Sequence, residues 1–224
     1  MYLWGEVFMK NFQENIVSSN NQNAASFYKY GSGNEFKILF IGNSITKHRP
    51  KPEIGWTNDC GMAASEVSKD YVHQLIAMIS KIKTNVSYAI LPIANFERDI
   101  INFDIEKNFD EAKEYDADII IMFFGTNVNK EYLENTEPFR IAYKNLRNYF
   151  YNAEKTKIFH VTCFYHRPQL DVQKKKVADE FGDIFIDISD ISNKEETHGQ
   201  FNHPSDLGMK EIAELFFENI KKYI

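Results

Sequence analysis

Short apolar runs alternate with longer amphipathic stretches along most of the chain. The runs that predict buried strands cover residues 36–41, 86–91, 118–124, 157–164 and 183–188. Segments with apolar residues at helical spacing cover residues 71–82, 137–151, 170–181 and 205–223. Residues 118–124 (DIIIMFF) are apolar at every position after Asp118. This continuous run is typical of a parallel strand that is covered on both faces.

Strands that alternate with helices predict a three-layer α/β/α domain around a mostly parallel sheet. Because crossovers between parallel strands are right-handed, few topologies remain. We favour a flavodoxin-like sheet of five strands in the order 2-1-3-4-5, in which ligands bind beyond the carboxyl ends of strands one and three. We assign residues 36–224 to this domain and residues 1–35 to a lead-in, since residues 18–33 are polar and rich in turn formers.

Composition restricts the class of partner. The 224 residues carry a net charge of −6, which argues against nucleic acid because phosphate binding needs a basic surface. No stretch reaches the roughly 18 consecutive apolar residues of a membrane span, and the N-terminus lacks the basic start of a secretory signal. Two cysteines, Cys60 and Cys163, cannot make a disulfide framework and are expected to be buried. We therefore predict a cytoplasmic protein without nucleic-acid or membrane partners.

Three polar segments fall where this topology would bind a ligand. Gly42-Asn43-Ser44-Ile45-Thr46 follows the first strand, Gly125-Thr126-Asn127 follows the third, and Asn202-His203-Pro204-Ser205-Asp206 precedes the last helix. Together they supply a hydroxyl, a carboxamide and an imidazole. A serine needs an adjacent base to become a nucleophile, and a developing oxyanion needs fixed donors, so the set fits acyl transfer.

These segments are similar to sequence blocks of the SGNH/GDSL hydrolase family, and the resemblance extends over about residues 36–222. Ser44 stands where the family has its nucleophile, Asn127 where it has an oxyanion donor, and His203 where it has the general base. The resemblance implies a serine esterase without a cofactor, acting on O-acetyl or other short acyl groups of a carbohydrate or small ester. A glycan O-acyltransferase, or a binding protein of the same fold with impaired chemistry, is the alternative.

One departure from the family pattern concerns the residue that orients the histidine. Where the family has an Asp three residues before the histidine, this chain has Gln200. A glutamine carbonyl can accept a hydrogen bond but cannot stabilise an imidazolium as a carboxylate does. Gln200, or a nearby carboxylate such as Glu195 or Glu196, is therefore the candidate to orient His203.

A second departure concerns the second block, which here reads IANFERD at residues 93–99 and has no glycine. The backbone N–H of Asn95, Phe96 or Glu97 is the candidate for the second oxyanion donor, beside the N–H of Ser44. The candidates for substrate contacts are Asn43, Trp56, Phe96 and Glu97. Trp56 belongs to a connection at residues 53–65 that is long for a strand-to-helix loop and is expected to form part of the pocket wall.

Other polar clusters are given structural roles. His198 and His203 have no third ligand at a suitable spacing, so we expect no metal. His48 is expected at the surface or behind the reacting groups, and Lys174-Lys175-Lys176 is expected to be a solvated helix face. The net negative charge fits a neutral sugar or ester substrate better than a polyanion.

Overall fold

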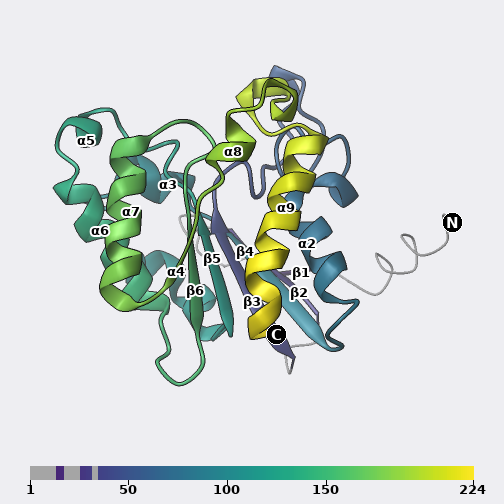
Figure 1. Cartoon of the computed structure of the whole chain (residues 1–224), viewed down its shortest axis with the longest axis horizontal. Coiled ribbons are helices and arrows are strands. Elements are labelled where there is room, and N and C mark those ends of the chain that lie inside the picture. Colours follow the sequence, from purple (N-terminus) through teal and green to yellow (C-terminus); the bar gives the residue numbers. More distant parts are fainter. Residues whose placement is uncertain (1–13, 18–25, 32–34) are drawn as a thin grey trace, which may run out of the picture.

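The computed structural model describes residues 14–17, 26–31 and 35–224 (Figure 1). In this part of the chain seven strands form one sheet in the order β1-β2-β4-β3-β5-β6-β7. The strands are β1 (Glu14–Val17), β2 (Phe27–Tyr30), β3 (Phe36–Gly42), β4 (Val86–Pro92), β5 (Ile119–Phe123), β6 (Lys157–Val161) and β7 (Ile184–Ile186). Five strands, in the sheet order β4-β3-β5-β6-β7, are all parallel. This order confirms the predicted 2-1-3-4-5 topology.

Two antiparallel strands extend the sheet beyond the five that the sequence predicted. β2 pairs with β4, and β1 pairs with β2. Phe27, Tyr28 and Tyr30 of β2 are buried, so this strand contributes to the core although it precedes residue 36. The strand count is thus corrected to seven for the described residues. Its short FYKY sequence inside a polar stretch gave no clear periodicity. Residues 1–13, 18–25 and 32–34 of the predicted lead-in lie outside the described part.

Helices cover both faces of the sheet, as predicted (Figure 1). The longer ones are α2 (Tyr71–Ile79), α4 (Ile105–Glu114), α6 (Glu137–Phe150), α7 (Pro168–Phe181) and α9 (Asp206–Ile220). Ile38 and Phe40 of β3 pack in the cluster that includes α2 and α9, whereas Leu39 and Ile41 pack in the cluster that includes α4, α6 and α7. This alternation explains why the central strands are apolar at every position.

The described residues also form three shorter helices, α3 (Ala94–Arg98), α5 (Glu131–Glu134) and α8 (Ser189–Ser192). Single 3₁₀ turns lie at residues 52–54, 67–69, 195–197, 200–202 and 221–223. Side-chain caps fix where the longer helices begin. The Asp70 carboxylate accepts from His73 N at the start of α2, and Ser205 Oγ accepts from Gly208 N at the start of α9. None of the helices in the described ranges combines the length and apolar character that a bilayer span requires.

Candidate active site

Ser44 lies in a tight turn directly after β3. The Asn43 carbonyl accepts from Thr46 N at 2.9 Å and from Lys47 N at 3.0 Å, and Asn43 Oδ1 accepts from Ile45 N at 3.1 Å. A Cβ atom at Gly42 would lie 1.8 Å from Thr46 Oγ1, so the close approach of the turn requires glycine there. These contacts fix the backbone on both sides of Ser44 and hold its hydroxyl at the carboxyl end of the sheet.

His203 reaches Ser44 from the turn before α9. Its Nε2 lies 2.7 Å from Ser44 Oγ, although the two residues are 159 positions apart in the sequence. Its Nδ1 lies 2.7 Å from the carbonyl oxygen of Phe201. A carbonyl can only accept, so Nδ1 carries the proton and Nε2 is the acceptor for the Ser44 hydroxyl. This is the tautomer that a general base needs.

The turn that presents His203 has an unusual backbone. Phe201 and Asn202 both have positive φ, 57° and 56°, a conformation that costs about 1–3 kcal/mol for a non-glycine residue. The turn thereby brings the Phe201 carbonyl within hydrogen-bond distance of His203 Nδ1. The Gln200 carbonyl accepts from His203 N at 3.0 Å, and Gln200 and Glu196 have exposed side chains. The expectation that Gln200 or Glu196 orients His203 through its side chain is therefore wrong, because a backbone carbonyl occupies that position.

Glu97 is the central polar residue behind the turn of Ser44. Its side chain is fully buried, and Oε1 accepts from Asn43 Nδ2 at 3.1 Å, from Gly125 N at 2.6 Å and from Asn127 N at 3.3 Å. Oε2 accepts from Asn127 Nδ2 at 2.6 Å. The expectation that Glu97 contacts substrate is thus corrected. Both carboxylate oxygens accept hydrogen bonds from the segments that follow β3 and β5, and so connect these segments.

Asn127 is held by Glu97 through one of its two amide N–H groups, which leaves the other free to donate. The position of α3 limits which backbone N–H can be the second oxyanion donor. Glu97 N already donates to Ile93 O at 3.1 Å, whereas the first N–H groups of a helix have no acceptor within the helix. Asn95 and Ala94 lie in this first turn and border the same cavity as Ser44 and Asn127. Asn95 therefore remains a candidate donor, and Ala94 is one that the sequence did not suggest.

Two aromatic candidates for substrate contacts are packed into the protein instead. Trp56 is 5% exposed, donates from Nε1 to the His48 carbonyl at 3.2 Å, and meets the ring of Phe201 edge-on. Phe96 is 1% exposed and packs edge-on against Phe124. Neither offers a face to a ligand, so both expectations are corrected. Trp56 supports the turn that carries His203.

A buried lysine lies behind the segment that carries Asn127. Gly125 has φ 132°, and a Cβ atom there would lie 2.6 Å from Cys163 Sγ and 3.2 Å from Lys174 Nζ. Lys174 is fully buried and contacts the Val161 carbonyl, Cys163 Sγ and Asp171 Oδ1 at 3.0–3.2 Å. Its expected place on a solvated face is wrong, because three acceptors satisfy its ammonium in the interior. Cys60 and Cys163 are buried as predicted, and burial raises the pKa of the Cys163 thiol to about 12.

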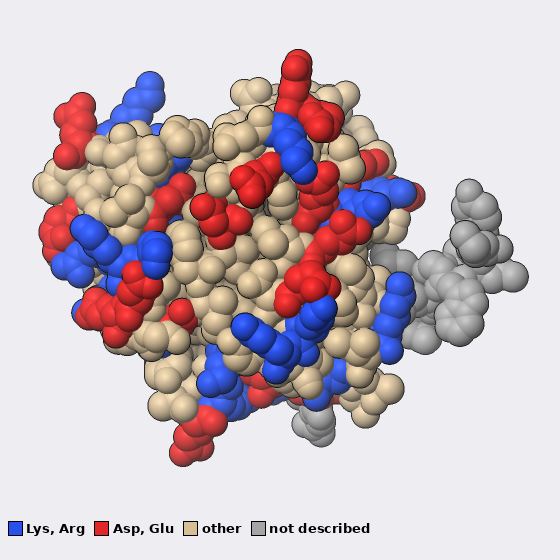
Figure 2. All heavy atoms as spheres, in the orientation of Figure 1, with Lys and Arg blue, Asp and Glu red and all other residues tan. Residues whose placement is uncertain are grey.

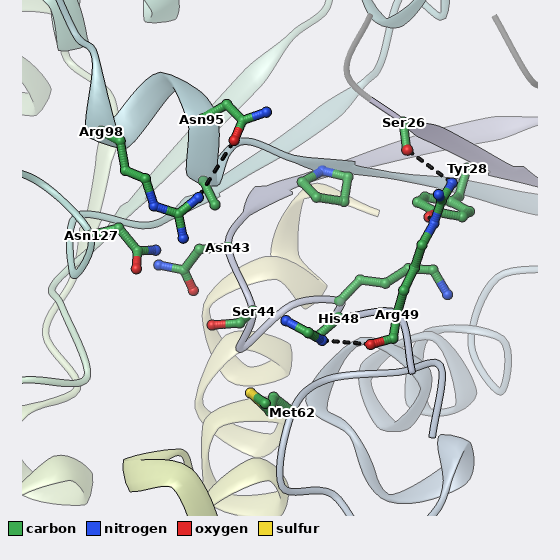
Figure 3. A pocket seen from close by; sticks show the side chains of 13 residues that line it. Ser26, Tyr28, Asn43, Ser44, His48, Arg49, Met62, Asn95, Arg98 and Asn127 are labelled. Atoms are coloured by element: carbon green, nitrogen blue, oxygen red, sulfur yellow. Dashed lines mark hydrogen bonds between the residues drawn. The ribbon is translucent and has the colours of Figure 1, made fainter. Parts of the chain in front are cut away.

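A cavity of about 390 Å³ opens beside Ser44 (Figure 3), within the usual size range of small-molecule sites. Asn43, Asn95 and Asn127 line this cavity together with Ser44. The side-chain amide of Asn43 also donates to Thr126 Oγ1 at 2.7 Å. The lining further includes Met62 and six residues that were not among the predicted substrate contacts: Ser26, Tyr28, Lys47, His48, Arg49 and Arg98. The basic run Lys47-His48-Arg49, directly after the segment that carries Ser44, could have indicated these lining residues. Met62 belongs to the connection at residues 53–65, which was predicted to form part of the pocket wall.

The environment of His203 predicts how activity depends on pH. Burial lowers the pKa of its imidazole, the Phe201 carbonyl raises it, and the charge of His48 lowers it, with a net value below the usual one of 6.5. Only the neutral ring can accept the Ser44 proton. We expect kcat/KM to be constant at neutral pH and to fall with a midpoint below 6.5 as the ring is protonated.

A pH profile of kcat/KM on a neutral ester checks this expectation. The H48Q variant serves as the control, because removing the imidazole of His48 should move the midpoint upward. A midpoint above 6.5 in the unsubstituted protein would contradict the assignment of the acid limb to His203.

No family model matches the chain, and no curated protein matches its sequence. Solved structures do match its fold. Est24, a carbohydrate acetylesterase from Sinorhizobium meliloti, is 14% identical with a TM-score of 0.55, covering 85% of this chain and all of that one. A candidate GDSL-like lipase from Bacteroides ovatus is 14% identical with a TM-score of 0.53, covering 84% and 99%. An extracellular lipase from Streptomyces rimosus is 10% identical with a TM-score of 0.51, covering 84% and 99%. The chain has the α/β/α fold of the SGNH/GDSL hydrolases.

Proposed function

We propose that the protein is a serine-dependent ester hydrolase that removes O-acetyl or other short acyl groups from a carbohydrate or a small ester. The observation that carries the proposal is the 2.7 Å contact between Ser44 Oγ and His203 Nε2. It is within the hydrogen-bond reach that a nucleophile and its base require. The acetylesterases and lipases of similar fold support the class of substrate.

In the first half of the reaction, Ser44 Oγ attacks the ester carbonyl and its proton passes to His203 Nε2. The negative charge that develops on the carbonyl oxygen is stabilised by the Ser44 N–H, the free N–H of the Asn127 amide and an N–H at the start of α3, which we assign to Asn95. Fixed donors of this kind contribute about 2.7–4 kcal/mol each in known cases. The carbon–oxygen bond to the alcohol then breaks, and His203 returns the proton to the leaving oxygen.

In the second half, water replaces the alcohol. His203 takes a proton from the water as its oxygen attacks the acyl-enzyme carbonyl, and returns the proton to Ser44 Oγ as the acyl–serine bond breaks. The products are the free acid and the unmodified enzyme. If a sugar hydroxyl replaced water in this step, the same site would catalyse acyl transfer.

Labelling with a fluorophosphonate probe tests the proposal. We expect one equivalent of covalent label on Ser44 and none in S44A, because only an activated serine attacks the phosphorus. Release of acetate from acetylated sugars, with and without a second sugar as acceptor, then separates hydrolysis from transfer. A folded protein that takes up no label would contradict the proposal and favour a binding protein of the same fold.

A further inference from the structure

The charge of the Ser44 cavity is opposite to that of the whole protein. The chain has a net charge of −6, and Figure 2 shows acidic and basic side chains interspersed on the face that carries α9. In contrast, the described residues that line the cavity include Lys47, Arg49 and Arg98 and no Asp or Glu. A site lined by one sign of charge concentrates ligands of the other sign.

The three cations differ in how far the protein neutralises them. Lys47 Nζ lies 3.0 Å from Asp59 Oδ1 and above the ring of Tyr28, so its charge is compensated. Neither Arg49 nor Arg98 has a carboxylate within 4.0 Å among the described residues. Both side chains are exposed at the rim of the cavity. Within the described part of the chain, both guanidinium groups thus have no anionic partner.

Neutral neighbours hold Arg49 in place. Its Nε donates to Tyr28 Oη at 2.7 Å, and one terminal nitrogen donates to Ser26 Oγ at 2.9 Å. A guanidinium has five N–H donors, and the described residues accept from two of them, which leaves three for a ligand. These contacts restrict the side chain without cancelling its charge, and a restricted side chain loses less entropy when it binds a ligand.

Arg98 lies on the other side of Ser44 in the view of Figure 3, with its guanidinium beside Asn127, whereas the guanidinium of Arg49 lies beside Ser26 and Tyr28. One terminal nitrogen of Arg98 is 3.5 Å from Asn95 Oδ1, the only contact of its guanidinium given by the described residues. No described residue accepts from its other donors. Both arginines line the cavity that contains Ser44.

We propose that the ester substrate carries an anionic group, a carboxylate or a phosphate, that pairs with Arg49 or with Arg98 at one side of the cavity. Guanidinium groups pair with these anions through two parallel hydrogen bonds, which neutral sugars cannot match. This inference rests on the proposed function and narrows it to acidic substrates, in place of the neutral ones that the net charge favoured. The small cavity suits a monomeric acid rather than a polymer chain.

Matched pairs of esters test the proposal. The probes are 3- and 4-acetoxybenzoate, each compared with its neutral methyl ester, so that the two members of a pair differ mainly in charge. We expect the unsubstituted protein to give a higher kcat/KM on the acid than on the methyl ester. We expect the substitution that removes the guanidinium facing the carboxylate of the probe, R49Q or R98Q, to lower this ratio about tenfold, and the double variant to lower it by a similar factor. R49K and R98K, which keep charge but lose the paired geometry, should lie in between.

R140Q is the matched control, since Arg140 lies on α6 and pairs with Glu137. It should leave the ratio unchanged. A ratio at or below one in the unsubstituted protein, or a ratio that the double variant does not change, would overturn the proposal while fluorophosphonate labelling of Ser44 still supported the esterase.

A binding measurement tests the anion site independently of the proposed hydrolase activity. Ligand-observed NMR with S44A should detect 3- or 4-hydroxybenzoate more strongly than the corresponding methyl ester, and the R49Q/R98Q substitutions should abolish the difference. If the protein takes up no fluorophosphonate but shows this preference, the anion site stands and the hydrolase proposal fails. If S44A shows no preference for the acid, the anion site fails.

Discussion

The H203A variant is expected to lose roughly four orders of magnitude or more in kcat/KM for ester hydrolysis. The imidazole is the only hydrogen-bond partner of Ser44 Oγ among the described residues, so its removal leaves no base there to take the proton. A serine hydroxyl alone is a poor nucleophile at neutral pH. Steady-state hydrolysis of a chromogenic acetate ester measures the loss. Circular dichroism of the same sample shows whether the variant is folded.

The informative control is the residue that would complete a triad in the family pattern. Because the Phe201 carbonyl, and no carboxylate, accepts the Nδ1–H of His203, Q200A and E196Q should stay within about threefold of the unsubstituted rate. A carbonyl fixes the tautomer but stabilises the imidazolium less than a carboxylate. A loss of tenfold or more in Q200A or E196Q would show that a side chain reaches His203 during catalysis.

The parallel core, and the places of Ser44 and Asn127 at its carboxyl end, could be predicted because buried strands leave a local pattern in the sequence. A strand buried on both faces is apolar at every position, and β5 is an example: alternate residues of Ile119–Phe123 enter the two core clusters. The parallel topology then places the carboxyl ends of β3 and β5 together. Ser44 and Asn127 follow directly from that arrangement.

The polar residues behind the site could not be predicted, because their burial depends on partners distant in sequence. Glu97 contacts Asn43, 54 positions before it, and Asn127, 30 positions after it. Lys174 is the first of three consecutive lysines, and nothing in the sequence distinguishes it from the other two as the buried one. A charged residue reads as solvated until the structure supplies its partners.

The predictions for the aromatic residues were wrong for a related reason. Trp56 stands in a loop with many polar residues, which suggested an exposed ring, but the ring packs against Phe201 in the histidine turn. Local polarity does not reveal that two loops 145 positions apart in number, at residues 56 and 201, cover one another. The arginines of the cavity were overlooked because net charge averages over a whole surface, whereas binding depends on the charge at one place.

Replacing Glu97 by alanine is expected to have the largest effect on stability, about 3–5 kcal/mol less free energy of unfolding. The carboxylate accepts four hydrogen bonds in the interior, and each buried donor left unsatisfied costs about 1–3 kcal/mol, less where water can enter. Urea unfolding measures the change. Glu114, exposed at the end of α4, supplies the matched control: E114Q should change stability by less than about 0.5 kcal/mol.

The isosteric E97Q variant separates stability from catalysis. A glutamine keeps the volume and one acceptor oxygen, but its amide N–H₂ would face a donor, so the Asn127 side chain loses its fixed orientation. We expect kcat to fall by about 10²-fold with little change in KM, as for removal of an oxyanion donor. Because Glu97 would act through Asn127, the double variant E97Q/N127A should be scarcely slower than N127A alone. Independent, multiplying losses in the double variant would show that Glu97 affects the reaction by another route, such as the turn that carries Ser44.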